Sequence, residues 1–112
     1  SDVRPLTDIV TVSMPEEDPF EIDLTYYINR NSQASTSIIE RDTRAAVEEY
    51  IQWQTGKMGR DINPSYLIQL IMAAGVKRVE VRKPTFKAVE ETHVARIVRN
   101  TMTVLNGGVE NA

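Results

Sequence analysis

The stretch of this chain that most resembles a chemical site is "TGKMGRDIN", in which Lys57 and Arg60 each follow a glycine. A glycine-rich turn carrying a lysine is part of a phosphate-binding loop, but that loop requires a Lys-Ser or Lys-Thr pair at the start of a helix. Here Met58 follows the lysine, and the next helix signal is Asn63–Pro64. Proline lacks one of the backbone N–H groups that would hold a phosphate. The sequence therefore predicts a connection between two helices, with Lys57 and Arg60 exposed.

The same loop invites comparison with the turn of a DNA-binding helix-turn-helix. A recognition helix presents polar or basic side chains to the edges of the bases. The segment after the loop instead reads "LIQLIMAA". Exposing it in a hydrated groove would forfeit about 1.5–3 kcal/mol of burial free energy for each large side chain. The formal net charge of −3 supplies no basic field either, so we expect no nucleic-acid partner.

The remaining candidates for catalysis or metal binding are His93 and two groups of carboxylates. His93 is the single histidine, and its surroundings, "EETHVAR", contain no nucleophile motif, so we interpret it as an exposed loop residue. The carboxylates at 16–18 and 90–91 do not match a calcium-binding loop, and zinc would need more histidine or cysteine than the chain contains. We expect no catalytic residue, no cofactor and no metal.

The segment "KRVEVRK" is the most basic part of the chain. On a strand, Arg78 and Arg82 would share one face with Glu80 between them. The two arginines could meet the carboxylates of a partner, and the alternative interpretation, which we favour, is a solvated sheet face. If the segment binds anything, a protein partner fits better than nucleic acid.

Strict alternation in "FEIDLTYYI" predicts a half-buried strand. Tyr27 falls on the outer face, opposite Tyr26. The inner face carries Phe20, Ile22, Leu24, Tyr26 and Ile28. Upstream, "DIVTVSM" predicts a short strand, and the two prolines of "PEEDP" predict a turn outside any ladder. The two strands are close enough in sequence to form a hairpin.

Two helices and two further strands complete the expected order. One helix should run from about Ser35 to Gln54 and stop at Gly56, and a second should begin at Asn63–Pro64 and end at Gly75. The second helix is apolar nearly all round, so either several neighbours or another subunit must cover it. "VKRVEVRK" and "NTMTVLN" predict strands, and "GGVENA" predicts a frayed or linking tail. Residues 85–99 support no assignment.

The expected order of elements predicts an α+β fold, because it runs strand, strand, helix, helix, strand, strand. We expect a two-layer sandwich in which two helices cover one face of a small mixed or antiparallel sheet of three to four strands. The length of 112 residues suits a single domain, residues 1–112, and 41% hydrophobic residues suit a globular one. The longest apolar run, "LIMAAGV", is too short to cross a membrane. The opening "SDVRPLTD" is typical of a linker, which predicts a piece of a longer protein, with a processed N-terminus as the alternative.

Three stretches resemble the C-terminal region of baseplate J-like proteins, which are baseplate wedge components of contractile-tailed bacteriophages and prophages. They are "VRPLTDIVTVSMPEEDPFEIDLTYYI", "AAVEEYIQWQTGKMGRDINPSYLIQLIMAAGVKRVEVRKP" and "TVLNGGVE". The order of the "RPLTD" opening, the "DLTYYI" strand, the "WQTGKMGRDINPSYL" junction and the closing "NGG" carries the resemblance. It covers nearly the whole chain and is weakest over "FKAVEETHVARIVRN".

The resemblance implies a structural subunit rather than an enzyme. Such a subunit would contact neighbouring copies and other baseplate proteins in a ring around the tail axis, with no small-molecule substrate and no membrane. It would be built in the host cytoplasm and end in the virion. Aromatic and charged side chains outside the core are then the interface candidates, namely Tyr27, Lys57, Arg60, Arg78 and Arg82. The alternative is a small ligand-binding or regulatory α+β domain, which a metabolite should stabilise against heat.

Overall fold

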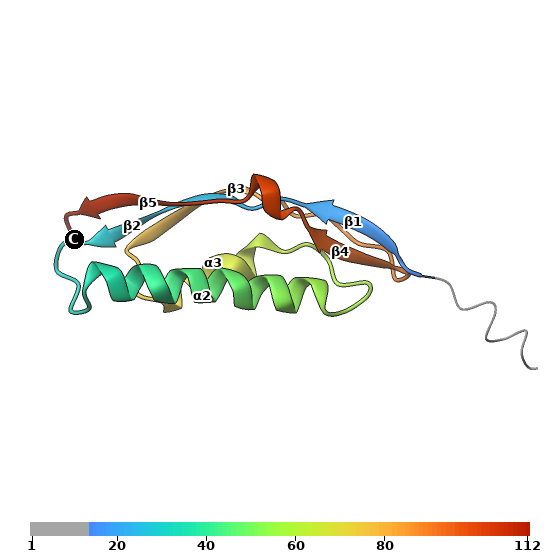
Figure 1. The fold of residues 1–112 in the computed structure, drawn as a ribbon, viewed down its shortest axis with the longest axis horizontal. Helices are drawn as coiled ribbons and strands as arrows, with labels where there is room; N and C mark the ends of the chain where they lie inside the picture. Colours follow the sequence, from blue (N-terminus) through green and yellow to red (C-terminus); the bar gives the residue numbers. More distant parts are fainter. Residues whose placement is uncertain (1–13) are drawn as a thin grey trace, which may run out of the picture.

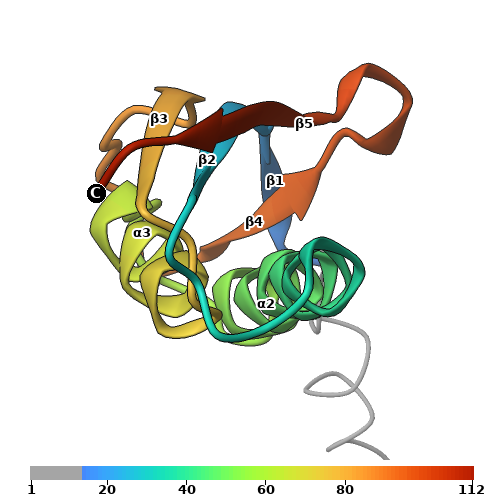
Figure 2. The ribbon, with the colours of Figure 1, turned by 90° about the vertical axis from the view of Figure 1, so that its left-hand side faces the viewer.

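The computed structural model describes residues 14–112 and shows a layer of strands lying on a layer of helices (Figures 1 and 2). Within this range the structure contains two helices and five strands, with a 3-10 turn at Arg99–Thr101 before the last strand. Three strands follow the helices, where the sequence predicted two. The elements are β1 (Glu16–Phe20), β2 (Asp23–Asn29), α2 (Thr36–Thr55), α3 (Pro64–Ala73), β3 (Arg78–Lys83), β4 (His93–Ile97) and β5 (Thr103–Glu110). The predicted fold class is confirmed.

The strands form two small sheets that follow one another along the long axis of the molecule (Figure 1). In the three-stranded sheet β2 lies at the centre, antiparallel to β3 and parallel to β5. This sheet is mixed and has the predicted size. At its end β1 and β4 form a separate parallel pair, which the sequence did not predict.

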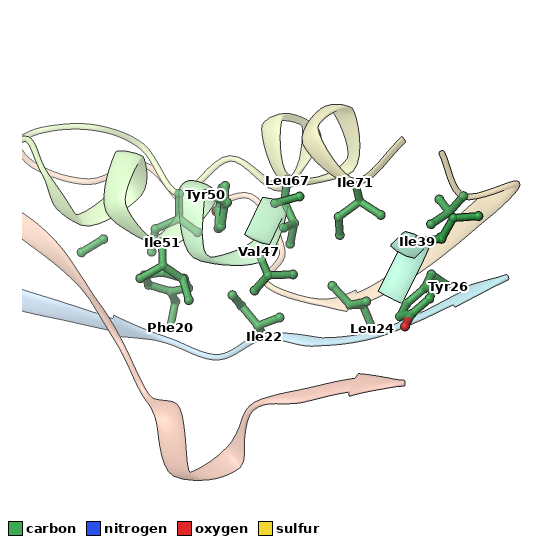
Figure 3. Packing of buried hydrophobic residues seen from close by; sticks show 14 of the residues in the cluster. Phe20, Ile22, Leu24, Tyr26, Ile39, Val47, Tyr50, Ile51, Leu67 and Ile71 are labelled. Atoms are coloured by element: carbon green, nitrogen blue, oxygen red, sulfur yellow. The ribbon is translucent and has the colours of Figure 1, made fainter. Parts of the chain in front are cut away.

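The core lies between β2 and the two helices, as the alternation predicted. All five inner residues, from Phe20 to Ile28, are at most 6% exposed. Figure 3 shows the first four pointing toward Val47, Tyr50 and Ile51 of α2 and toward Leu67 and Ile71 of α3. Burying each such side chain contributes about 1.5–3 kcal/mol to folding, so this interface is the main source of stability.

Both helices begin where their capping residues predict. The Ser35 hydroxyl accepts a hydrogen bond from the backbone N–H of Ile38, 3.4 Å away, and Gly56 follows the last turn of α2. The Asn63 side chain accepts from the N–H of Ser65 at 3.1 Å, with Pro64 in the first helical position. These bonds satisfy N–H groups that a helix start leaves without a partner.

The helix α3 is covered on only one side. Leu67 and Ile71 are fully buried, whereas Ile68 and Met72, one helical turn apart, are 37% and 41% exposed. The predicted surplus of apolar surface on this helix is therefore confirmed, because the described residues cover Ile68 and Met72 only in part.

The turn predicted for "PEEDP" is wrong, because these residues include most of β1. Pro19 stands opposite Arg96 in the parallel pair. An edge strand tolerates proline, since one of its sides needs no N–H donors, and within residues 14–112 β1 pairs with β4 alone. The strand predicted at "DIVTVSM", and with it the hairpin, lies outside the described residues.

The frayed tail predicted for "GGVENA" is also wrong, because β5 continues through Gly107 and Gly108 to Glu110. Val109 pairs with Ile28 and Glu110 with Asn29, after a shift in register that follows Tyr26. Gly108 has φ 108°, a conformation that other residues adopt only with strain. The two glycines therefore form an irregularity within the strand, and they hide its alternation in the sequence.

Candidate functional site

Three of the five predicted interface residues meet on the outer face of the three-stranded sheet. Tyr27 points away from the core because its neighbours in β2 point inward. The antiparallel register places Arg78 directly opposite it, and the guanidinium carbon lies 3.8 Å from the centre of the Tyr27 ring. Such a cation–π contact is worth about 0.5–1 kcal/mol at an exposed site. Arg82 lies on the same face of β3, four residues further along, where its side chain reaches Asp23 and Thr25 of β2.

Arg78 binds the last residue of β5. Its Nε and Nη2 donate to the two carboxylate oxygens of Glu110 at 2.9 and 2.8 Å, and Nη1 donates to Glu80 at 2.8 Å. Lys77 adds a third bond to Glu110 at 3.0 Å. The hydrogen bond from Arg78, followed in size of effect by that from Lys77, lowers the pKa of Glu110 to about 2. Arg78 therefore joins β3 to β5 across β2, a task the sequence did not reveal.

Arg82 joins β3 to β2 in the same way. Its Nη2 lies 2.8 Å from Asp23 Oδ1 and 2.9 Å from Thr25 Oγ1, and this bond lowers the pKa of Asp23. Its side chain nevertheless remains 46% exposed. The ion pairs on the outer face thus join strands of the same sheet, and their side chains remain partly exposed to solvent.

Lys57 and Arg60 lie in the helical layer, on the loop between α2 and α3, and not on the outer face of the sheet. Lys57 is exposed, as predicted. The prediction of an exposed Arg60 is wrong, because its side chain is half-buried. Its Nη1 donates to the carbonyl oxygen of Trp53 at 2.6 Å, and its guanidinium carbon lies 4.2 Å from the centre of the Trp53 ring.

The loop is organised by Gln54, which the sequence reasoning missed. The Gln54 side chain is fully buried. Its Oε1 accepts from the Tyr50 hydroxyl at 2.7 Å and from the Asn63 N–H at 3.0 Å. Its Nε2 donates to the carbonyl oxygens of Arg60 and Asp61, at 3.3 and 2.8 Å. A polar residue four positions after Tyr50 on the apolar stripe of α2 was the available signal.

His93 is in β4 and not in an exposed loop, so that prediction is wrong. Its side chain is 19% exposed, and Nδ1 lies 2.9 Å from Oδ1 of Asp18 in β1. Carboxylate oxygens of Glu16 and Glu90 lie 3.8 and 3.7 Å from Nε2. The parallel pairing of β1 and β4 therefore brings together the two carboxylate groups that are far apart in the sequence. Asp18 raises the pKa of His93, and His93 lowers that of Asp18.

Stability should fall as pH rises past the pKa of His93. Because the pKa of His93 is raised in the folded state, protonation of His93 stabilises the fold. This contribution is fully present below pH 6.5, the ordinary pKa of histidine, and it is lost as the pH rises through the folded-state pKa. The lowered pKa of Asp18 works on the acid side, where the contribution is lost as pH falls below 3.8. Urea unfolding at several values from about pH 5.5 to about pH 8.5 measures the alkaline loss. The His93→Gln variant should lack it; the same slope in that variant would refute the assignment.

Alanine at Gly107 should destabilise the sheet by about 1–3 kcal/mol, because its Cβ would overlap the Tyr27 ring and lie 2.8 Å from Thr25 Cγ2. The Tyr27 ring lies over this glycine, with Arg78 stacked on it. Urea unfolding of Gly107→Ala, Tyr27→Ala and the double variant forms a cycle. The glycine substitution should cost less once the ring is gone. Additive costs would show that the ring and the glycine do not interact.

Among residues 14–112 no group of three or more histidine, cysteine, aspartate or glutamate side chains is arranged to hold a metal ion. Over the same residues, neither helix is both long enough and apolar enough to span a bilayer.

Comparison with known proteins identifies one family. The model of the Baseplate J-like protein C-terminal domain matches residues 22–105, which include β2, both helices, β3, β4 and the start of β5. A search of curated proteins finds no match to the chain.

Proposed function

This chain belongs to the family of Baseplate J-like protein C-terminal domains, and on that premise we propose that it is a structural subunit of a contractile-tail baseplate wedge. The family is a structural phage domain that is not known for catalysis, and its place is the phage tail. In this proposal the subunit occupies the baseplate wedge and acts through protein–protein contacts during tail assembly.

The uncovered side of α3 is the observation that best supports contacts with other subunits. Ile68 and Met72 are more than one-third exposed on a helix whose opposite side fills the core. Together they offer a partner apolar surface on one helix face, the kind of surface through which proteins associate. Association with other tail proteins follows from the family.

The proposal extends to the arrangement of the subunit in the particle. Residues 1–112 form one domain at the C-terminal end of a longer baseplate protein, and copies contact one another and other baseplate proteins in a ring around the tail. Assembly takes place in the host cytoplasm. Five side chains lie at the contacts: Tyr27, Lys57, Arg60, Arg78 and Arg82.

Quantitative mass spectrometry of purified tail particles tests this function. Peptides from the chain should occur at a fixed ratio to the sheath and tube proteins. If the chain is present in the lysate but missing from intact tails, it is not a structural subunit.

Replacing Arg82 with glutamine should leave the fold intact and lower the yield of assembled tails. Arg82 is 46% exposed and its ion pair with Asp23 lies at the surface, where such pairs contribute little to folding. Charges at the rim of a protein interface mainly affect the rate of association and the register of the two partners. The yield of complete tails, counted by electron microscopy, is the measurement, with Arg41→Gln as a control, because Arg41 also forms an exposed ion pair, on α2. Equal yields from both variants would remove Arg82 from the interface.

A further inference from the structure

A cavity of about 400 Å³ opens where the two sheets meet. Its walls come from three parts of the chain: the end of β1, the loop before α3, and β3 with the residues that follow it. The volume lies within the range of sites that bind small molecules or single side chains, roughly 300–1,000 Å³. The lining residues are Pro19, Phe20, Glu21, Ile62, Arg82, Lys83, Pro84, Thr85 and Lys87.

The floor of this cavity is apolar and firmly held. Phe20 and Ile62 are 6% and 1% exposed, and the core packs behind them. The backbone of Ile62 is bonded in both directions to that of Lys87, at 2.9 and 3.1 Å. Phe86 stands between Thr85 and Lys87 in the sequence but is not among the lining residues, and its side chain is 62% exposed. An exposed aromatic outside the cavity can contact a peptide that extends beyond the rim.

The rim carries three cations and one carboxylate, and the three cations are not equally engaged. Arg82 is bonded to Asp23, and Lys83 to Glu21 at 2.8 Å. The Lys87 ammonium lies 3.9 Å from the nearest Asp18 oxygen, and the other oxygen of Asp18 is bonded to His93. Lys87 therefore has the weakest internal partner of the three and is 56% exposed.

We propose that this cavity binds an acidic and apolar peptide segment of a neighbouring tail protein, an inference that rests on the proposed function. Lys87 would hold a carboxylate of the segment, and an apolar side chain of the segment would lie on Phe20 and against Phe86. The charge of the rim selects an anion, and the apolar floor selects a peptide over a phosphate group.

Nuclear magnetic resonance titration of the 112-residue chain with short capped peptides tests the proposal. The probe alternates leucine with aspartate; in two matched peptides asparagine replaces the aspartates, or serine replaces the leucines. The Leu-Asp peptide should move the amide signals of Phe20, Ile62 and Lys87 in a saturable way. Each matched peptide should bind at least about fivefold more weakly, about 1 kcal/mol. No shift at about 5 mM peptide, or equal binding of the asparagine peptide, would overturn the proposal.

Two surface variants sharpen the test without touching the core. Lys87→Gln and Phe86→Ala should each weaken binding of the Leu-Asp peptide about three- to tenfold, whereas Arg30→Gln, also at an exposed position, should leave it unchanged. Unaltered binding by the Lys87 and Phe86 variants would overturn the proposal. The same shifts produced by inorganic phosphate would also overturn it and show a simple anion site.

The two proposals fail in distinguishable ways. A chain that is present in tails at a fixed ratio but does not bind the peptide refutes the cavity proposal alone. Specific peptide binding by a chain that is absent from tails refutes the structural role and leaves a peptide-binding domain.

Discussion

Replacing Gln54 with leucine should lower the free energy of unfolding by about 3–5 kcal/mol. Leucine fills a similar space but leaves the Tyr50 hydroxyl, the Asn63 N–H and the Asp61 carbonyl without their partner. Each buried polar group left unsatisfied costs about 1–3 kcal/mol. The loss should also loosen the loop from Gly56 to Asn63. Urea unfolding followed by circular dichroism gives the change in free energy.

Gln52→Leu is the matched control for this variant. Gln52 belongs to the same helix and is exposed, so the same substitution there should change stability by no more than about 0.5 kcal/mol. If the two variants were equally stable, the bonds around Gln54 would not hold the loop.

Truncating Leu24 to alanine should cost about 2–5 kcal/mol. Leu24 is fully buried near the start of β2, where it faces both helices. The substitution removes apolar contact and leaves a cavity that the surrounding sheet and helices cannot fully close. Urea unfolding again measures the loss, and a shift of the midpoint at constant slope would show that stability has changed while the surface exposed on unfolding has not.

Leu105→Ala supplies the comparison for Leu24. Leu105 pairs with Thr25 in the same sheet, on its outer face, and is 53% exposed. We expect its loss to cost less than about 0.5 kcal/mol. Equal costs at the two positions would contradict the assignment of inner and outer faces.

Local signals in the sequence predicted the elements that local physics determines. The alternation of β2, the Ser35 cap and the Asn63–Pro64 start each depend on residues a few positions apart, and each is confirmed. The outward direction of Tyr27, Arg78 and Arg82 followed from the same alternation. Their convergence on one face required the antiparallel pairing of β2 with β3, which local signals do not give.

The failures share a cause in pairing between distant segments. β1 contains Pro19 and has no apolar alternation, so its state depends on β4. His93 is ordered by Asp18, which is 75 positions away. The end of β5 carries two glycines of low strand propensity, and pairing with β2 and the bonds from Arg78 to Glu110 hold it in the sheet. Gln54 was missed because a polar residue on an apolar stripe shows its purpose only when its partners are known.

The position of β5 beside β2 has a consequence for synthesis. Asp23, near the start of the domain, pairs with Thr103, and Asn29 with Glu110. The central strand β2 therefore lacks one of its two neighbouring strands until almost the whole domain has left the ribosome. Contacts between such distant segments also slow folding, because a long loop must close before they form. During that interval one edge of β2 is open to pairing with other nascent chains, and it closes only when β5 pairs with it.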